Sequence, residues 1–146
     1  MVLKISRGVW FVSTLATLAS LLIIYASLPE RVFLIQDGLE YVSANREVFF
    51  YVALGLITLV NAMVYIVRTL FQKEEAFRAW FHLLIVSVNV FFIVALFFLS
   101  AYNSTERFNF QKVGFIVYGS VALVVVCALF WPVYSLFRKI SSKQVV

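Results

Sequence analysis

The stretch from residue 83 to residue 101 reads LLIVSVNVFFIVALFFLSA and contains no ionisable side chain. As an α-helix rising about 1.5 Å per residue, it is about 28 Å long. The hydrocarbon core of a bilayer is about 30 Å thick. The stretch does not alternate apolar and polar residues, as a membrane β-strand does. It therefore predicts a helix that crosses a membrane.

Three similar apolar runs lie elsewhere in the chain, separated by charged or turn-forming residues. Of all residues, 64% are hydrophobic and 13% are charged, whereas soluble domains are about half apolar and roughly a quarter charged. We therefore expect an all-α integral membrane protein, a single domain over 1–146 with four transmembrane helices in an up-down bundle. The expected helices cover 9–27, 48–70, 79–101 and 112–138.

The first run follows Lys4 and Arg7, as the apolar part of a signal peptide would. Such segments are about 7–15 residues long and end at a small-x-small cleavage site. Here the run reaches residue 27, and Tyr25 stands where a small residue is needed. The run is interpreted as a retained signal anchor.

The positive charges predict an orientation. With the N-terminus inside, eight of the twelve basic residues lie in the inner segments and four in the outer loops. Short cytoplasmic loops carry the excess of Lys and Arg. We expect a multi-pass protein of the plasma (inner) membrane with both termini cytoplasmic. The net charge of +5 then reflects topology and not nucleic-acid binding, because basic residues do not alternate with exposed aromatics.

Segment 28–47 is the longest stretch outside the runs. Two short apolar groups flank Asp37-Gly38, which is typical of a β-hairpin. An amphipathic segment lying on the outer leaflet is the alternative, and a plain connector is a third. If the segment binds a partner, the contact candidates are Val32, Phe33, Leu34, Ile35 and Tyr41.

Residues 25–43 also carry a family resemblance. The sequence LPERV at 28–32 follows a helix that ends near Tyr25, and Gly38, Tyr41 and Ser43 come after it. This pattern resembles a bacterial membrane domain of unknown function found in SdpI-like immunity and signalling proteins. Phe33 stands where that domain has its second proline, and Ile35 lies near the position of its histidine. No site residue is therefore transferred.

Two asparagines lie inside the predicted helices. Asn61 comes nine residues before Leu70 and Asn89 nine residues after Trp80, so a tight turn between the helices puts both at the same depth, about 13 Å. An amide–amide hydrogen bond between helices is expected. Two smaller polar residues, Thr58 and Ser87, lie close to them in sequence. The alternative interpretation is a neutral polar path for a solute.

His82 and Cys127 are the only residues of their types. His82 is expected in the aromatic belt at the membrane surface. The alternative is a hydrogen bond to a quinone, or metal binding completed by a partner. A single buried cysteine behaves as a small hydrophobe. No catalytic, cofactor-binding or metal-ligating set is expected.

The runs lack intramembrane charge, which proton and ion transport usually require. The first hypothesis is a non-catalytic four-helix subunit that assembles with other integral membrane subunits, or with itself, through helix faces and segment 28–47. Its other partner is the lipid bilayer. The alternative is a small transporter, channel or lipid- or quinone-binding protein that uses Asn61 and Asn89.

Overall fold

The computed structural model describes residues 1–37, 40–104 and 110–143. Within those ranges the chain forms four helices and two strands, which are α1 Val2–Ser27, β1 Arg31–Asp37, β2 Glu40–Asn45, α2 Arg46–Leu70, α3 Glu75–Tyr102 and α4 Phe110–Lys143. All four helices are long and apolar enough to cross a membrane. The expectation of four membrane-spanning helices is confirmed to that extent, and the chain is a candidate multi-pass membrane protein.

Each helix extends beyond the apolar run that predicts it. The helix expected to start at residue 9 starts at Val2, and the one expected to end at residue 138 reaches Lys143. An apolar run marks the part of a helix that can lie in lipid. The backbone hydrogen bonds of the helix continue into the charged flanks. Asn45 caps α2, its side-chain oxygen accepting from Glu47 N at 2.9 Å.

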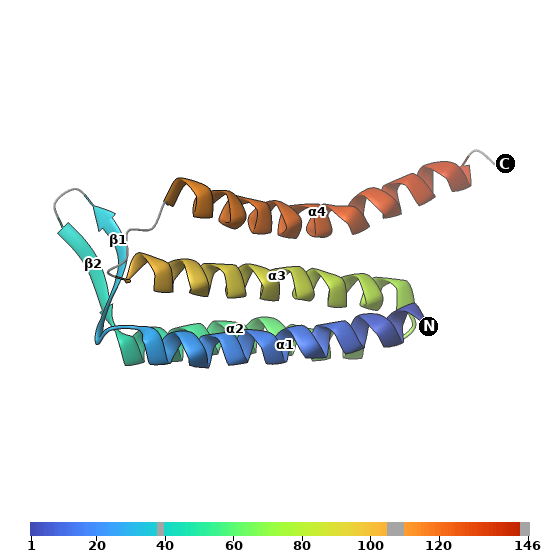
Figure 1. Ribbon diagram of the computed structural model, residues 1–146. Coiled ribbons are helices and arrows are strands. Elements are labelled where there is room, and N and C mark those ends of the chain that lie inside the picture. The colour runs from blue at the N-terminus through green and yellow to red at the C-terminus, as the bar shows by residue number, and fades with distance from the viewer. Residues whose placement is uncertain (38–39, 105–109, 144–146) are drawn as a thin grey trace.

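Helices α1, α2 and α3 pack around a common axis, and α4 lies along α3 (Figure 1). The buried residues of α1 include Trp10, Thr17, Leu21 and Ile24. Their spacing of seven, four and three residues places them on one side of a helix. The small buried residues Ser6, Thr17 and Ser20 also lie on α1. Small residues allow helix backbones to approach closely, and α1 packs most extensively against α3.

The interior of the three-helix unit has two apolar layers. The layer at the hairpin end contains Leu21, Ile24, Leu28, Val32, Ile57 and Leu96. The layer at the opposite end contains Trp10, Val64, Phe81 and Ile85. Polar residues lie between the two layers on all three helices. They include Thr17 of α1, Asn61 of α2 and Asn89 of α3.

Segment 28–47 forms paired strands and not an amphipathic segment. β1 and β2 are antiparallel, with Arg31 opposite Asn45, and the register shifts between Phe33 and Ile35. The Arg46 backbone N–H donates to Glu30 O at 2.9 Å and closes the base of the hairpin. An isolated hairpin is marginal in stability, so contacts with the helices have to support it.

Two contacts attach the hairpin to the helices. Val32 is fully buried in the layer at the hairpin end. Asn103, after the end of α3, bonds the backbone of Phe33 twice. Its Oδ1 accepts from Phe33 N at 2.7 Å, and its Nδ2 donates to Phe33 O at 3.0 Å. The hairpin is therefore fixed to the end of α3 by the Asn103 side chain. Its amide accepts from and donates to the Phe33 backbone, as the backbone of a neighbouring strand would.

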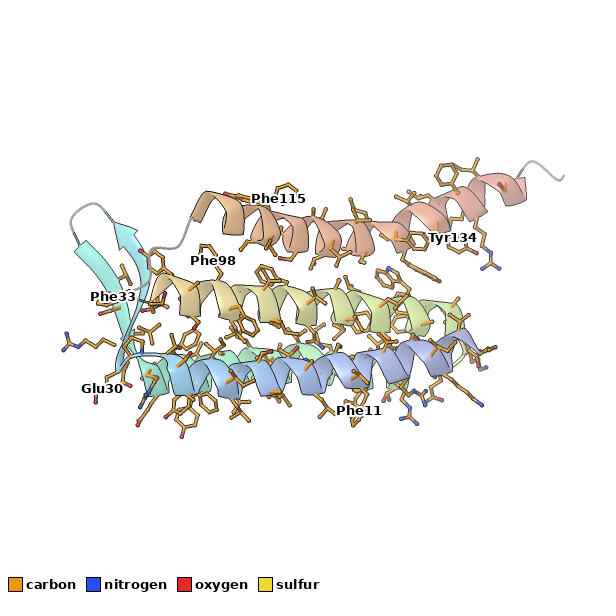
Figure 2. The ribbon with its side chains drawn as sticks, viewed as in Figure 1. Phe11, Glu30, Phe33, Phe98, Phe115 and Tyr134 are labelled. Atoms are coloured by element: carbon orange, nitrogen blue, oxygen red, sulfur yellow. The ribbon has the colours of Figure 1, made fainter. Side chains whose placement is uncertain are left out.

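Helix α4 is held by α3. Trp80 Nε1 donates to Cys127 O at 2.7 Å, and the Trp80 ring stacks on Trp131 with centroids 5.8 Å apart. Most of the described side chains of α4 are exposed, and 6% of its spanning window is buried against 17–28% for the other helices. Phe115 points away from α3 (Figure 2). Pro132 lies inside α4, and the helix bends towards its C-terminal end in Figure 1.

Candidate functional site

The candidate site is a group of buried and half-buried polar side chains between the two apolar layers, completed by Trp10 of the layer opposite the hairpin. We call it the amide cluster, and it consists of Asn61 on α2, Asn89 on α3, and Trp10, Ser13, Thr14 and Thr17 on α1. Asn89 is 0% exposed and Asn61 is 6% exposed. Burial of this degree requires that the polar atoms find partners inside the protein.

The two asparagine amides bond each other reciprocally. Asn61 Nδ2 donates to Asn89 Oδ1 at 2.9 Å, and Asn89 Nδ2 donates to Asn61 Oδ1 at 3.1 Å. The second hydrogen of Asn61 Nδ2 goes to the backbone oxygen of Ile57 at 2.9 Å. The structure therefore brings together the two residues that were expected to pair, and joins α2 to α3 through them.

Helix α1 supplies the rest of the cluster. Trp10 Nε1 donates to Asn61 Oδ1 at 2.9 Å, and Thr14 Oγ1 donates to the same oxygen at 2.8 Å. Ser13 Oγ accepts from Asn89 Nδ2 at 3.0 Å. Thr17 Oγ1 lies 3.4 Å from Asn89 O and 2.8 Å from Ser13 O. One hydrogen-bond network thus connects all three helices.

The chemistry available to the amide cluster is limited. Its side chains are amides, hydroxyls and an indole, and none of these titrates near neutral pH. The four amide hydrogens of Asn61 and Asn89 all have acceptors. Among the described residues, the buried side-chain atoms without a partner are Arg46 Nε and Arg78 Nε, and neither is in the cluster. The arrangement is suited to holding helices together.

The two other polar residues predicted for this contact lie elsewhere. Thr58 is exposed on α2. Ser87 is buried, but its Oγ donates to Leu84 O at 2.7 Å within its own helix. Neither bonds to Asn61 or Asn89 among the hydrogen bonds described here. Residues two apart on a helix do not share a face, which excludes Ser87 from the Asn89 contact. Thr58 lies about one turn from Asn61 but is exposed, at the margin of that face.

His82 is buried inside the bundle, and its expected place in the aromatic belt at the membrane surface stays a prediction. Its Nδ1 lies against Arg78 O, and because a carbonyl only accepts, Nδ1 carries the proton. The ring meets Trp10 edge-on, with centroids 5.7 Å apart. Trp10 therefore contacts His82 with its ring and Asn61 with its N–H. Among the described residues, no three His, Cys, Asp or Glu side chains gather as a metal site would.

The partner-binding candidates of the hairpin divide into three groups. Val32 is buried and is not available to a partner, so that assignment is wrong. It points to the core because alternate residues of a strand face opposite sides. Phe33 and Leu34 are exposed. The side chains of Ile35 and Tyr41 lie outside the described part of the structure.

Sequence reasoning missed the share of α1 in the cluster. The signal was present as polar or indole side chains at 10, 13, 14, 17 and 20, which recur every three or four residues. This pattern indicates a polar stripe along a helix otherwise apolar. It does not say which neighbouring side chains the stripe meets, because that depends on the rotation of α1 about its own axis.

Comparison of the chain with protein-family models, with curated proteins and with solved structures found no match. Function therefore has to be argued from the residues and their geometry.

Proposed function

We propose that this chain is a non-catalytic membrane subunit that binds another integral membrane protein, or a second copy of itself, through helix α4 and the hairpin. In this proposal α1, α2 and α3 form a self-contained scaffold that the amide cluster holds in register. The hairpin and α4 are presented at its edge.

The exposure of α4 carries the proposal. This helix is attached by α3, and many of its described apolar side chains are exposed. Helices in lipid associate through close packing, which small residues permit. Gly119 and Ala122 are exposed on α4 together with Val126, and the space around Gly119 is open within 4 Å. A partner helix can approach this stripe without displacing other side chains.

The orientation belongs to the same proposal. The chain crosses the plasma (inner) membrane four times, up and down in alternation, with both termini in the cytoplasm and the hairpin outside. The support is the bias of Lys and Arg together with Figure 1, where the N-terminus and the end of α4 lie at the end opposite the hairpin.

The amide cluster weighs against the alternative of a neutral polar path. A solute that passes through a protein needs polar groups that are free to exchange partners. The amide hydrogens of Asn61 and Asn89 are already bonded within the bundle. Releasing one of them would leave a buried donor without a partner, at a cost of about 1–3 kcal/mol.

Site-specific photo-crosslinking tests the proposal. The photoreactive residue p-benzoylphenylalanine replaces Val126 of α4, which is 65% exposed, or Val12 of α1, which is 64% exposed. The variants are expressed at native level and irradiated in native membranes. We expect Val126 to yield a discrete protein adduct, whose mass identifies a second copy or another subunit.

Val12 is the matched control, because residue type and exposure are the same while the helix differs. We expect it to yield lipid adducts alone. If the photoreactive residue at 126 also gives lipid adducts alone, α4 faces the bilayer and the proposed interface is wrong.

A further inference from the structure

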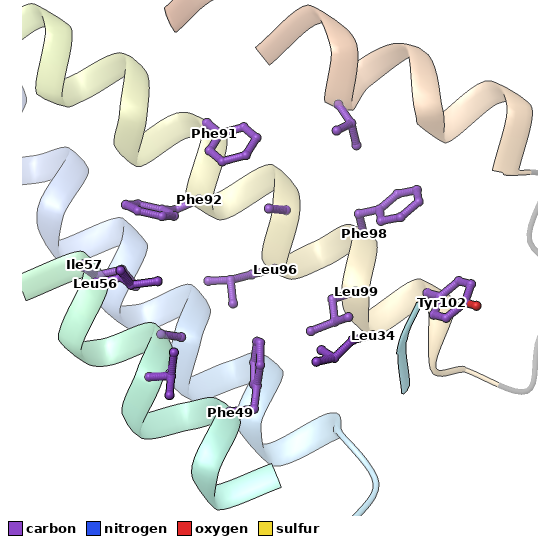
Figure 3. Close-up of a pocket in the computed structure, with 14 residues that line it drawn as sticks. Leu34, Phe49, Leu56, Ile57, Phe91, Phe92, Leu96, Phe98, Leu99 and Tyr102 are labelled. Atoms are coloured by element: carbon purple, nitrogen blue, oxygen red, sulfur yellow. The ribbon is translucent and has the colours of Figure 1, made fainter. Parts of the chain in front are cut away.

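A large apolar groove runs along one side of the molecule and adjoins the amide cluster at Ile57. It has a volume of about 640 Å³ and is lined by residues of α2 and α3, with Leu34 of β1 and Val117 of α4 at its edges. Figure 3 shows side chains from these elements around the opening, Phe91, Phe92 and Phe98 among them. Apart from backbone atoms and the hydroxyl of Tyr102, its lining is hydrocarbon.

Small side chains make room for this groove. Ala53 of α2 and Ala95 of α3 both line it. The neighbouring positions carry large side chains, such as Phe49 and Phe92, which form walls. A leucine at either alanine would occupy space that is now empty. Residue size at these two positions therefore offers a way to fill part of the groove.

The length of the groove matches one leaflet of a membrane. On α3 the lining runs from Phe91 to Tyr102, which at about 1.5 Å per residue is about 16 Å. Half of the hydrocarbon core is about 15 Å. A helix that crosses the membrane needs about twice that length. At the other end of α3, Phe77 contacts both Phe71 and Trp131, with centroids 4.6 and 5.3 Å apart.

The groove is also continuous with the apolar surface of the helices. Val52 and Leu56 line it and are at the same time exposed on α2. In a bilayer these side chains meet lipid tails, so a tail can enter from the side without passing a polar group. An empty apolar groove of this size would forfeit dispersion contacts along its whole lining.

From the length, the lining and the lateral opening, we infer that the groove binds one acyl chain of a phospholipid from the leaflet on the hairpin side. The chain lies between α2 and α3, over Ala53 and Ala95. The phospholipid head group then lies beside the hairpin, near Leu34. This lipid is held longer than the lipids around it, because walls contact it on more than one side.

Retention of lipid by filled-groove variants tests the inference. The full chain is reconstituted in nanodiscs of palmitoyl-oleoyl phosphatidylglycerol, released into a mild detergent and examined by native mass spectrometry. We expect one retained phospholipid on most wild-type molecules, and at least a tenfold lower occupancy in Ala53→Leu and in Ala95→Leu. Two variants are used because Ala53 also packs against the core layer at the hairpin end. A loss of lipid in Ala53→Leu alone would therefore not separate a filled groove from a disturbed core.

Ala62→Leu is the matched control, since Ala62 is exposed on the same helix and is not among the groove residues. It should retain lipid as the wild type does. Retention by both groove variants, or no retained lipid on the wild type, would overturn the inference. So would p-benzoylphenylalanine at Leu56 giving a protein adduct in native membranes in place of a lipid adduct, because a partner helix would then occupy the groove.

Discussion

At the scale of the residue, the reciprocal bond between Asn61 and Asn89 is the central feature. An asparagine in a membrane helix is tolerated when its amide finds partners, and here each amide is the principal partner of the other. Trp10 and Thr14 add two more donors to Asn61 Oδ1. Because these bonds form in one alignment of the three helices, the cluster specifies register as well as adding stability.

A double-mutant cycle tests this interpretation. Asn61→Leu and Asn89→Leu should each lower the free energy of unfolding by about 1–3 kcal/mol, since each leaves the other amide buried with unmet donors. The double variant should cost less than the sum of the two, because both partners are gone. Unfolding in bicelles measures all three values.

Thr58→Val is the control, because Thr58 is exposed on α2, and its effect should stay within about 0.5 kcal/mol. Strictly additive single variants, or single variants as stable as the wild type, would show that the amide pair does not couple α2 to α3.

At the scale of the element, α4 differs from the other three helices. It has comparable length and hydropathy, and its contacts with α3 include those of Trp80 with Cys127 and Trp131. Cys127, whose backbone oxygen accepts from Trp80, precedes Pro132 on α4 by a little more than one turn. A proline inside a helix bends it. The attachment of α4 to α3 therefore includes aromatic contacts and one described hydrogen bond from a side chain.

Trp80→Phe should loosen this junction. Phenylalanine keeps a ring against Trp131 but loses the N–H that bonds Cys127 O, at a cost of about 0.5–1.5 kcal/mol. Spin labels at Thr69→Cys and Phe137→Cys, in a Cys127→Ser background, report the distance between α2 and α4. We expect the distance distribution to broaden in Trp80→Phe.

The pair Thr69→Cys and Ile5→Cys serves as a reference for α1 and α2. Its distribution should be unchanged by Trp80→Phe, because neither helix depends on that bond. An unchanged distribution for α4 would mean that packing alone holds it.

At the scale of the whole molecule, the polar and apolar parts are arranged along the helix axes. The hairpin stands at one end, and the link between α2 and α3 lies at the other with the N-terminus (Figure 1). The acyl-chain groove occupies the half near the hairpin. The two ends of the molecule therefore present different surfaces.

Cysteine labelling tests the orientation. In a Cys127→Ser background, Ser43→Cys places a thiol on the exposed hairpin and Gln72→Cys places one on the exposed link between α2 and α3. A membrane-impermeant maleimide added to intact cells should label residue 43 and not residue 72. After lysis it should label both. The reverse pattern in intact cells would put the hairpin in the cytoplasm.

Much of the fold was predictable, and the reason is local. Apolar run length predicted the helices, because a helix in lipid satisfies its own backbone and needs no knowledge of the neighbours. The Asn61–Asn89 pair was predictable because a short link brings equal depths together. The resemblance of residues 25–43 to the SdpI-like membrane domain and the proposed partners remain predictions.

The amino-acid sequence by itself determined four apolar helices and predicted the pairing of the two asparagines, and it left segment 28–47 open between a hairpin, an amphipathic segment and a connector. Only the tertiary structure decided that α1 completes the amide cluster, that Val32 is core, that His82 is buried against Trp10, and that α4 stands apart. Each of these depends on how a helix or strand is rotated towards its neighbours. Periodicity identifies the side chains that share a face, and packing between elements decides what that face meets.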